Sequence, residues 1–186
     1  GLVIDGNSRL YAGGVFTRSD DTLNNVAKWA GSGWQRMGFG LKQGAKAANT
    51  VQDMVMGNDF IGMDDTNYAD DTVYAIGGFV GTCNDAGCGS TARTAKGIAQ
   101  YSQADDTWYP VGSGTLTGLQ SSTQVFAGAY IDDTLYVGGN FTTIGGVSAS
   151  LVAQHTAAGG WEPLGAGLGS TATSGYAIAL HQTTKD

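Results

Sequence analysis

The stretch LYVGGNFTTIGG, residues 135–146, joins a strand-like apolar run to a Gly-Gly pair. Two similar phrases, LYAGGVFT at 10–17 and VYAIGGFV at 73–80, occur earlier in the chain. The phrases begin 63 and 62 residues apart, and a fixed long period indicates structural repeats. The chain is therefore expected to contain three copies of one structural unit.

Each unit contains more than the glycine phrase. A second apolar run follows each phrase, then a run led by tryptophan, and an alternating run precedes the phrase. The second runs are NVAKWAG at 25–31, GIAQYSQ at 97–103 and LVAQHTA at 151–157. Short apolar runs bounded by Asp, Asn and Gly predict strands joined by tight turns. No stretch keeps a helical period, so four antiparallel strands per unit are expected.

Four short strands in each repeat are typical of a β-propeller blade. We expect an all-β protein in which residues 1–186 form one β-propeller segment. Its three blades span approximately 1–41, 50–115 and 124–168, and 175–182 begins a further blade. Because a single four-stranded sheet has two faces to cover, blades need neighbours on both sides.

Two kinds of repeated residue are expected to pack the blades. The paired glycines allow close backbone approach or a positive φ, and each tryptophan covers the gap between adjacent sheets. These residues are Gly13, Gly14, Gly77, Gly78, Gly138, Gly139, Trp34, Trp108 and Trp161.

The second unit resembles the kelch repeat, in which an apolar strand ending in Gly-Gly is followed by a Tyr and then a Trp. VYAIGG, Tyr101 and Trp108 carry this resemblance, whereas Trp29 and His155 replace the Tyr in the other units. The third unit looks closest to kelch-like repeats of secreted and cell-surface proteins, such as the fungal cortical polarity-marker ectodomain and similar bacterial surface proteins. The resemblance implies a propeller fold and is poorly specific for function.

Three blades and one strand do not complete a ring, because propellers usually close with about four to eight blades. Either the chain is part of a larger propeller, which we favour, or two or more copies complete one ring. The expected partners are therefore other protein segments or copies of the chain.

Charge and hydropathy limit the partners. The net charge of −7, with nine scattered Lys and Arg residues, disfavours nucleic acid and anionic membranes. No apolar run approaches the roughly 20 residues of a membrane-spanning helix, so no membrane insertion is expected within this segment. The opening residues read as strand, turn and strand rather than as a signal peptide.

The two cysteines, Cys83 and Cys88, lie in the loop after the second phrase. Asn, Asp, Ala and Gly separate them, which is favourable turn chemistry, so a small disulfide within the loop is expected. A disulfide indicates an oxidising, extracellular or cell-surface location. A zinc site is not expected, because the chain has no second cysteine pair.

Asn140-Phe141-Thr142 is a glycosylation sequon, so Asn140 is a candidate glycosylation site, although the same tripeptide also belongs to the repeat.

The tripeptide Asp-Asp-Thr occurs five times in the chain and predicts solvated turns. Adjacent carboxylates also suit Ca²⁺, and the acidic insertion 59–71 is the best candidate. Its weak calcium ligands are Asp64, Asp65, Asp70 and Asp71.

Catalytic residues and cofactors are not predicted. The only histidines, His155 and His181, cannot be assembled into a Ser-His-Asp set, and His155 occupies a repeat position. The copper site of a propeller oxidase has no matching motif here, and no glycosidase carboxylate pair stands out among 16 acids. An enzyme of either kind is the weakest alternative.

Three non-catalytic functions remain. The first is an extracellular or cell-surface structural or adhesive module that mediates protein interaction or assembly. The second is a lectin-like propeller that binds a glycan in pockets between blades. The third is a subunit of an extracellular fibre, formed by head-to-tail contacts between incomplete propeller ends.

Overall fold

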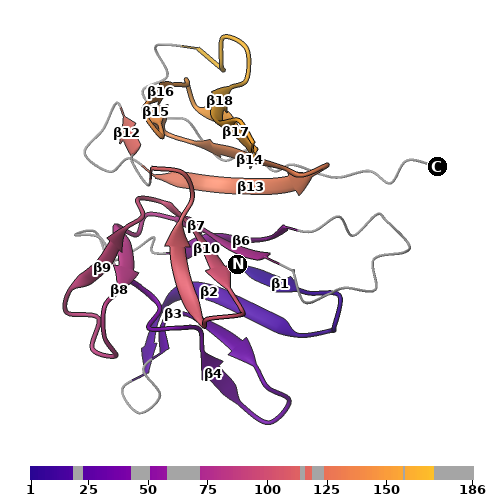
Figure 1. The fold of residues 1–186 in the computed structure, drawn as a ribbon, viewed down its shortest axis with the longest axis vertical. Coiled ribbons are helices and arrows are strands. Elements are labelled where there is room, and N and C mark those ends of the chain that lie inside the picture. The colour runs from indigo at the N-terminus through magenta and orange to yellow at the C-terminus, as the bar shows by residue number, and fades with distance from the viewer. Residues whose placement is uncertain are drawn as a thin grey trace.

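The structure is a computed structural model that describes residues 1–18, 23–42, 51–57, 72–113, 116–118, 124–156 and 158–169. These residues form strands and turns, and none of them is helical, which confirms the all-β expectation. The strands belong to three four-stranded and two three-stranded antiparallel sheets. Figure 1 shows the three larger sheets following one another along the molecule.

The three larger sheets, named sheets I, II and III, share one design. In each, four strands lie side by side in chain order, and the repeated glycine phrase begins in the second strand. Sheet I contains β1 (Leu2–Ile4), β2 (Leu10–Arg18), β3 (Leu23–Trp29) and β4 (Trp34–Arg36). Sheet II contains β6 (Val51–Gly57), β7 (Thr72–Gly77), β10 (Ile98–Ser102) and β11 (Thr107–Pro110). Sheet III contains β13 (Val125–Ile131), β14 (Thr134–Gly139), β17 (Val152–Thr156) and β18 (Gly160–Pro163).

Strand register places the repeated aromatic residues at equivalent positions. Across the third and fourth strands of each sheet, the residue opposite the tryptophan is an aromatic or a histidine. The three pairs are Trp29 with Trp34, Tyr101 with Trp108, and His155 with Trp161. The substitutions of Trp29 and His155 for a tyrosine therefore leave the strand pairing unchanged.

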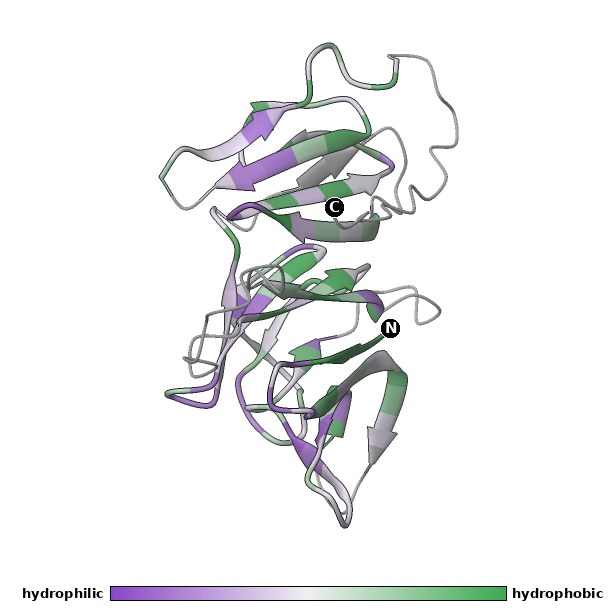
Figure 2. Cartoon of the chain, turned by 90° about the vertical axis from the view of Figure 1, so that its right-hand side faces the viewer, coloured by the Kyte–Doolittle hydropathy of each residue, from purple (hydrophilic) through white to green (hydrophobic). Residues whose placement is uncertain are grey.

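Two apolar clusters hold the sheets together. One lies between sheets I and II and includes Tyr11, Val73 and Trp108. The other lies between sheets II and III and includes Ile76, Leu135 and Trp161. Because successive residues of a strand point to opposite faces, sheet II contributes one face to each cluster. Figure 2 shows hydrophobic strand segments facing one another between the sheets.

Two three-stranded sheets, here called bridging sheets, connect neighbouring larger sheets. In each, a short strand that follows one larger sheet pairs with the hairpin between the second and third strands of the next. The first bridging sheet contains β5 (Leu41–Lys42), β8 (Gly81–Cys83) and β9 (Thr91–Thr94). The second contains β12 (Leu116–Gly118), β15 (Phe141–Ile144) and β16 (Val147–Ser148). The segments after Trp34 and Trp108 therefore complete the next unit.

Candidate functional site

The junction between neighbouring sheets centres on a tryptophan indole that reaches back to the preceding sheet. Trp108 Nε1 donates a hydrogen bond to the Met37 carbonyl at 2.9 Å. Trp161 Nε1 makes the equivalent bond to the Val111 carbonyl at 3.4 Å. Met37 and Val111 each lie three residues after the tryptophan of their own sheet. The two junctions thus use the same donor and the same acceptor position.

The aromatic partner of each tryptophan completes the junction. Ring centroids lie 5.3 Å apart for Tyr101 and Trp108, and 4.9 Å apart for His155 and Trp161. Burial, followed by the hydrogen bond to Asp106, raises the pKa of Tyr101 well above its ordinary value. Burial lowers the pKa of His155, because desolvation disfavours the imidazolium. Both partners are therefore held neutral near pH 7.

A glycine with positive φ follows each acceptor position. These residues are Gly38, Gly112 and Gly165, with φ of 54°, 62° and 57°. A Cβ on Gly112 would lie 2.8 Å from Trp161 Cδ1, so this glycine also lets the indole approach. The pattern Trp-x-x-apolar-Gly occurs three times, in WQRMG, WYPVG and WEPLG. That repetition is the signal by which sequence reasoning could have found the acceptor, which it missed.

None of the glycine pairs singled out in the sequence has a positive φ. A Cβ on Gly13 would lie 2.4 Å from Val51 Cγ1 of the next sheet. A Cβ on Gly139 would lie 2.2 Å from the Gln124 carbonyl oxygen. Close approach, rather than an unusual dihedral angle, is what these two positions require.

Within the described part of the chain, the outward side of sheet III lacks the cover that equivalent residues have elsewhere. Met37 and Val111 are 0% and 3% exposed, whereas Leu164 at the same position is 37% exposed. Leu41 of the first bridging sheet is fully buried, whereas Leu168, which follows an equivalent Gly-x-Gly, is 62% exposed. The junction acceptor of sheet III is therefore uncovered.

The described residues also leave sheet I uncovered on the opposite side. Leu2 pairs with Ala12 in sheet I, and Met54 pairs with Ala75 at the equivalent position of sheet II. Leu2 is nevertheless 69% exposed, whereas Met54 is 5% exposed. Trp29 is 39% exposed, whereas Tyr101 at the equivalent position is 2% exposed. The uncovered sides of sheets I and III are thus the two complementary halves of the junction seen twice inside the chain.

The predicted disulfide is present and lies within the first bridging sheet. Cys83 and Cys88 are bonded, and their Cα atoms are 4.7 Å apart. Lys42 Nζ donates to the Cys88 and Gly89 carbonyls, and Asn24 Nδ2 donates to the Ala86 carbonyl at 3.0 Å. The disulfide loop is therefore fastened to segments that come from sheet I.

A cavity of about 380 Å³ opens beside this loop. It is lined by charged residues from sheet I, the β8–β9 hairpin and the β10–β11 turn, with aromatic residues among them. Its charged lining residues are Arg36, Arg93, Asp105 and Asp106. A more open groove of about 390 Å³ continues past Lys28 and Trp34. Sequence reasoning missed this cavity, because its residues come from separate segments that only the packing of the sheets brings together.

The remaining predicted positions are more dispersed. Asn140 Oδ1 accepts a hydrogen bond from the Gln124 backbone N–H, which ties the sequon to the start of sheet III. Asp132 and Asp133 have positive φ and form the turn between β13 and β14. His181, the strand predicted at 175–182, and the calcium candidates Asp64, Asp65, Asp70 and Asp71 lie outside the described residues.

Within the described part of the chain, no cluster of three His, Cys, Asp or Glu side chains is placed to hold a metal ion. The same residues include no helix long and apolar enough to cross a membrane.

Comparison with known proteins found no match: no protein family, curated protein or solved structure matches the chain.

Proposed function

We propose that the chain is a non-catalytic, kelch-like β-propeller segment whose function is assembly outside the cell or at its surface. The observation that carries this proposal is the exposure of both halves of the repeated junction, on sheet I and at the end of sheet III. The disulfide supports an oxidising location. Tyr101, Met54 and Leu41, the equivalents of Trp29, Leu2 and Leu168 at the junction of sheets I and II, are all buried.

The partner we propose is a second copy of the chain. In that contact, Trp34 of one copy donates its indole N–H to the Leu164 carbonyl of the other, as Trp108 does to Met37. Leu168 then takes the place that Leu41 has in the first bridging sheet. The two patches differ, so the contact is head-to-tail.

Head-to-tail contacts close into a ring or continue as a fibre. Two copies supply six four-stranded sheets, which falls within the roughly four to eight blades of known propellers. Three copies would exceed that range, so the expected closed form contains two copies. A fibre is the open form of the same contact.

Sedimentation velocity tests this proposal with two variants, each of which disrupts one of the two patches that form the contact. Ile4→Asp places a charge on the uncovered side of sheet I, and Leu168→Asp does so at the end of sheet III. We expect the unmodified chain to associate and each variant alone to remain monomeric. An equimolar mixture of the two variants should form a 1:1 complex through the one intact interface that remains.

A monomeric unmodified chain at all accessible concentrations would contradict the proposal. Self-association of either variant alone would instead indicate contact between like faces.

A lectin-like module is the second candidate function, and the cavity beside the disulfide loop favours it.

A further inference from the structure

The cavity beside the disulfide loop lies where sheet I, sheet II and the first bridging sheet meet. Phe39 and Gly40 belong to the segment leaving sheet I, Thr82 and Arg93 to the bridging sheet, and Trp108 to sheet II. At about 380 Å³ it falls within the range of small-molecule sites. Its walls contain both hydrogen-bond donors and acceptors.

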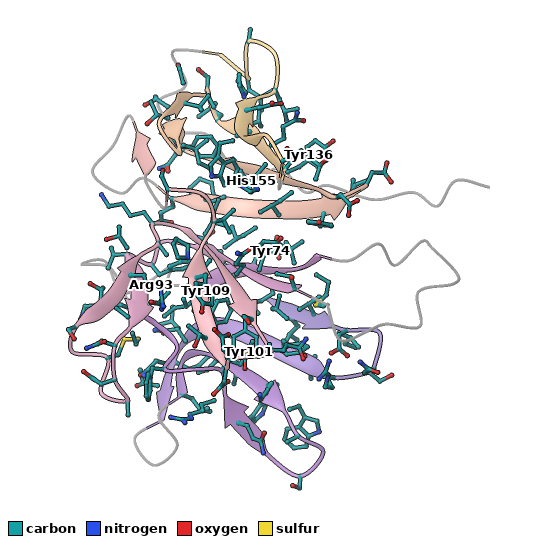
Figure 3. The ribbon with its side chains drawn as sticks, in the orientation of Figure 1. Tyr74, Arg93, Tyr101, Tyr109, Tyr136 and His155 are labelled. Atoms are coloured by element: carbon teal, nitrogen blue, oxygen red, sulfur yellow. A yellow bond between two sulfur atoms is a disulfide. The ribbon has the colours of Figure 1, made fainter. Side chains whose placement is uncertain are left out.

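Two guanidinium groups in the cavity wall stack on aromatic rings. Arg36 lies over the Phe39 ring at 5.2 Å, and Arg93 lies over the Tyr109 ring at 4.6 Å. Figure 3 shows Arg93 beside Tyr109. Among the described residues neither guanidinium forms a close ion pair such as that of Arg9 with Asp5, although Arg93 is near enough to Asp105 to help lower the pKa of that carboxyl. Stacking leaves the edge N–H donors of both groups available to a carboxylate.

The two aspartates of the cavity are already engaged by hydroxyl and amide donors. Asp106 Oδ1 accepts hydrogen bonds from the Tyr101 hydroxyl and from the Gly38 N–H. Asp105 Oδ2 accepts one from the Tyr109 hydroxyl. Hydrogen bonds from Ser102 and Tyr109 lower the pKa of Asp105, so it remains ionised. These hydrogen bonds hold both carboxylates in position at the cavity wall.

The cavity also contains an unsatisfied hydroxyl and an exposed ring. Thr82 is 3% exposed and lines the cavity, and its Oγ1 has no hydrogen-bond partner among the described residues. A buried polar group without a partner is costly unless a ligand or water completes it. Phe39 is 41% exposed and offers an apolar face at the same place.

We propose that this cavity binds a carboxylate-bearing sugar of the hexuronate class. The sugar carboxylate meets Arg36 and Arg93, its hydroxyl groups meet Asp105 and Asp106, and its ring packs on Phe39. A simple carboxylate would leave the acceptors and the ring unused, and a neutral hexose would leave the guanidinium groups unpaired. The inference deepens the lectin-like candidate and does not depend on assembly.

Three matched probes test the site by NMR titration of the folded chain at constant ionic strength: glucuronate, glucose and acetate. Glucuronate carries both recognised features, glucose only the hydroxylated ring, and acetate only the carboxylate. We expect saturable shifts with glucuronate at roughly millimolar concentration, and binding at least about tenfold weaker for the other two.

Arg93→Gln and Arg36→Gln should each weaken glucuronate binding by about tenfold or more, because each removes a charge-assisted hydrogen bond. Lys96→Gln is the control, since Lys96 is an exposed cation outside the cavity lining. Equal binding of glucose and glucuronate, equal binding of acetate, or unchanged binding in Arg93→Gln would each overturn the proposal. Binding by a variant that cannot assemble, such as Leu168→Asp, separates this result from that of the assembly proposal.

Discussion

The two sheet junctions share a tryptophan–carbonyl hydrogen bond but are reinforced differently. Between sheets I and II, a disulfide loop holds Lys42 and Asn24, and Asp106 ties Tyr101 to the Gly38 N–H. Between sheets II and III, the hairpin is closed by a Gly145-Gly146 turn, and Gly145 lies directly against the Trp161 ring. The repeat specifies the junction, and the variable loop determines what strengthens it.

The tryptophan itself should dominate both junctions. Trp108→Ala is expected to lower the free energy of unfolding by about 3–5 kcal/mol, because the side chain is fully buried in the core. In the monomeric Leu168→Asp background, Trp34→Ala should cost only about 1 kcal/mol, since Trp34 is half-buried and its ring centroid lies 5.5 Å from that of Trp29. Urea unfolding followed by circular dichroism measures both losses. Similar losses in the two variants would show that a tryptophan packed against a neighbouring sheet stabilises the fold no more than a tryptophan on an uncovered side.

The glycine turn at the second junction should have the next largest effect. Gly145→Ala combines a positive φ with a Cβ placed 2.3 Å from Trp161 Cδ1, so a loss of about 3 kcal/mol is expected. Gly146→Ala is the matched control, because its φ is also positive but nothing lies within 4 Å. Its expected cost is about 1 kcal/mol in the same unfolding experiment. Equal costs would show that strain alone, and not ring packing, requires Gly145.

The disulfide should stabilise the first junction by a smaller amount. Its loop is short, and closing it stabilises the fold by about 2 kcal/mol. We expect added reductant to lower the unfolding midpoint of the unmodified chain by a corresponding amount. The Cys83→Ala/Cys88→Ala double variant should show the lower midpoint with or without reductant. If reductant also destabilises this double variant, the effect does not come from the bond.

The smallest expected effect concerns His155, which replaces the tyrosine of the first junction. Burial lowers the pKa of His155 below its ordinary value of 6.5. The unfolded chain therefore binds more protons than the folded chain as the pH falls through 6.5. The contribution of His155 to stability should therefore decrease as the pH falls through that value. His155→Tyr should remove this part of the pH dependence, measured by urea unfolding at about pH 7.5 and about pH 5.5. An unchanged pH profile in His155→Tyr would contradict this assignment.

Much of the strand order could be predicted from the sequence, because the repeated features are local. The glycine phrases and the tryptophans Trp34, Trp108 and Trp161 mark the second and fourth strands directly. The two aspartates between β13 and β14 likewise indicate a turn. Alternation and turn chemistry suffice at this scale, since each depends on residues only a few positions apart.

Other features could not be predicted from local pattern. The strand β5 is two residues long, and its partner Thr82 lies 41 positions after Leu41, so no local period reveals the pairing. Arg36, Arg93 and Asp105 come together only through the packing of sheet I against the bridging hairpin.

Because of the bridging sheets, the segment that ends one sequence repeat belongs structurally to the next folded unit. A shortened chain that begins at Val51, where the first strand of sheet II starts, would lack β5. The β8–β9 hairpin would then have an unpaired edge and be exposed to aggregation. Any grafting or duplication of these units should therefore keep each trailing Gly-x-Gly segment in one piece with the hairpin that receives it.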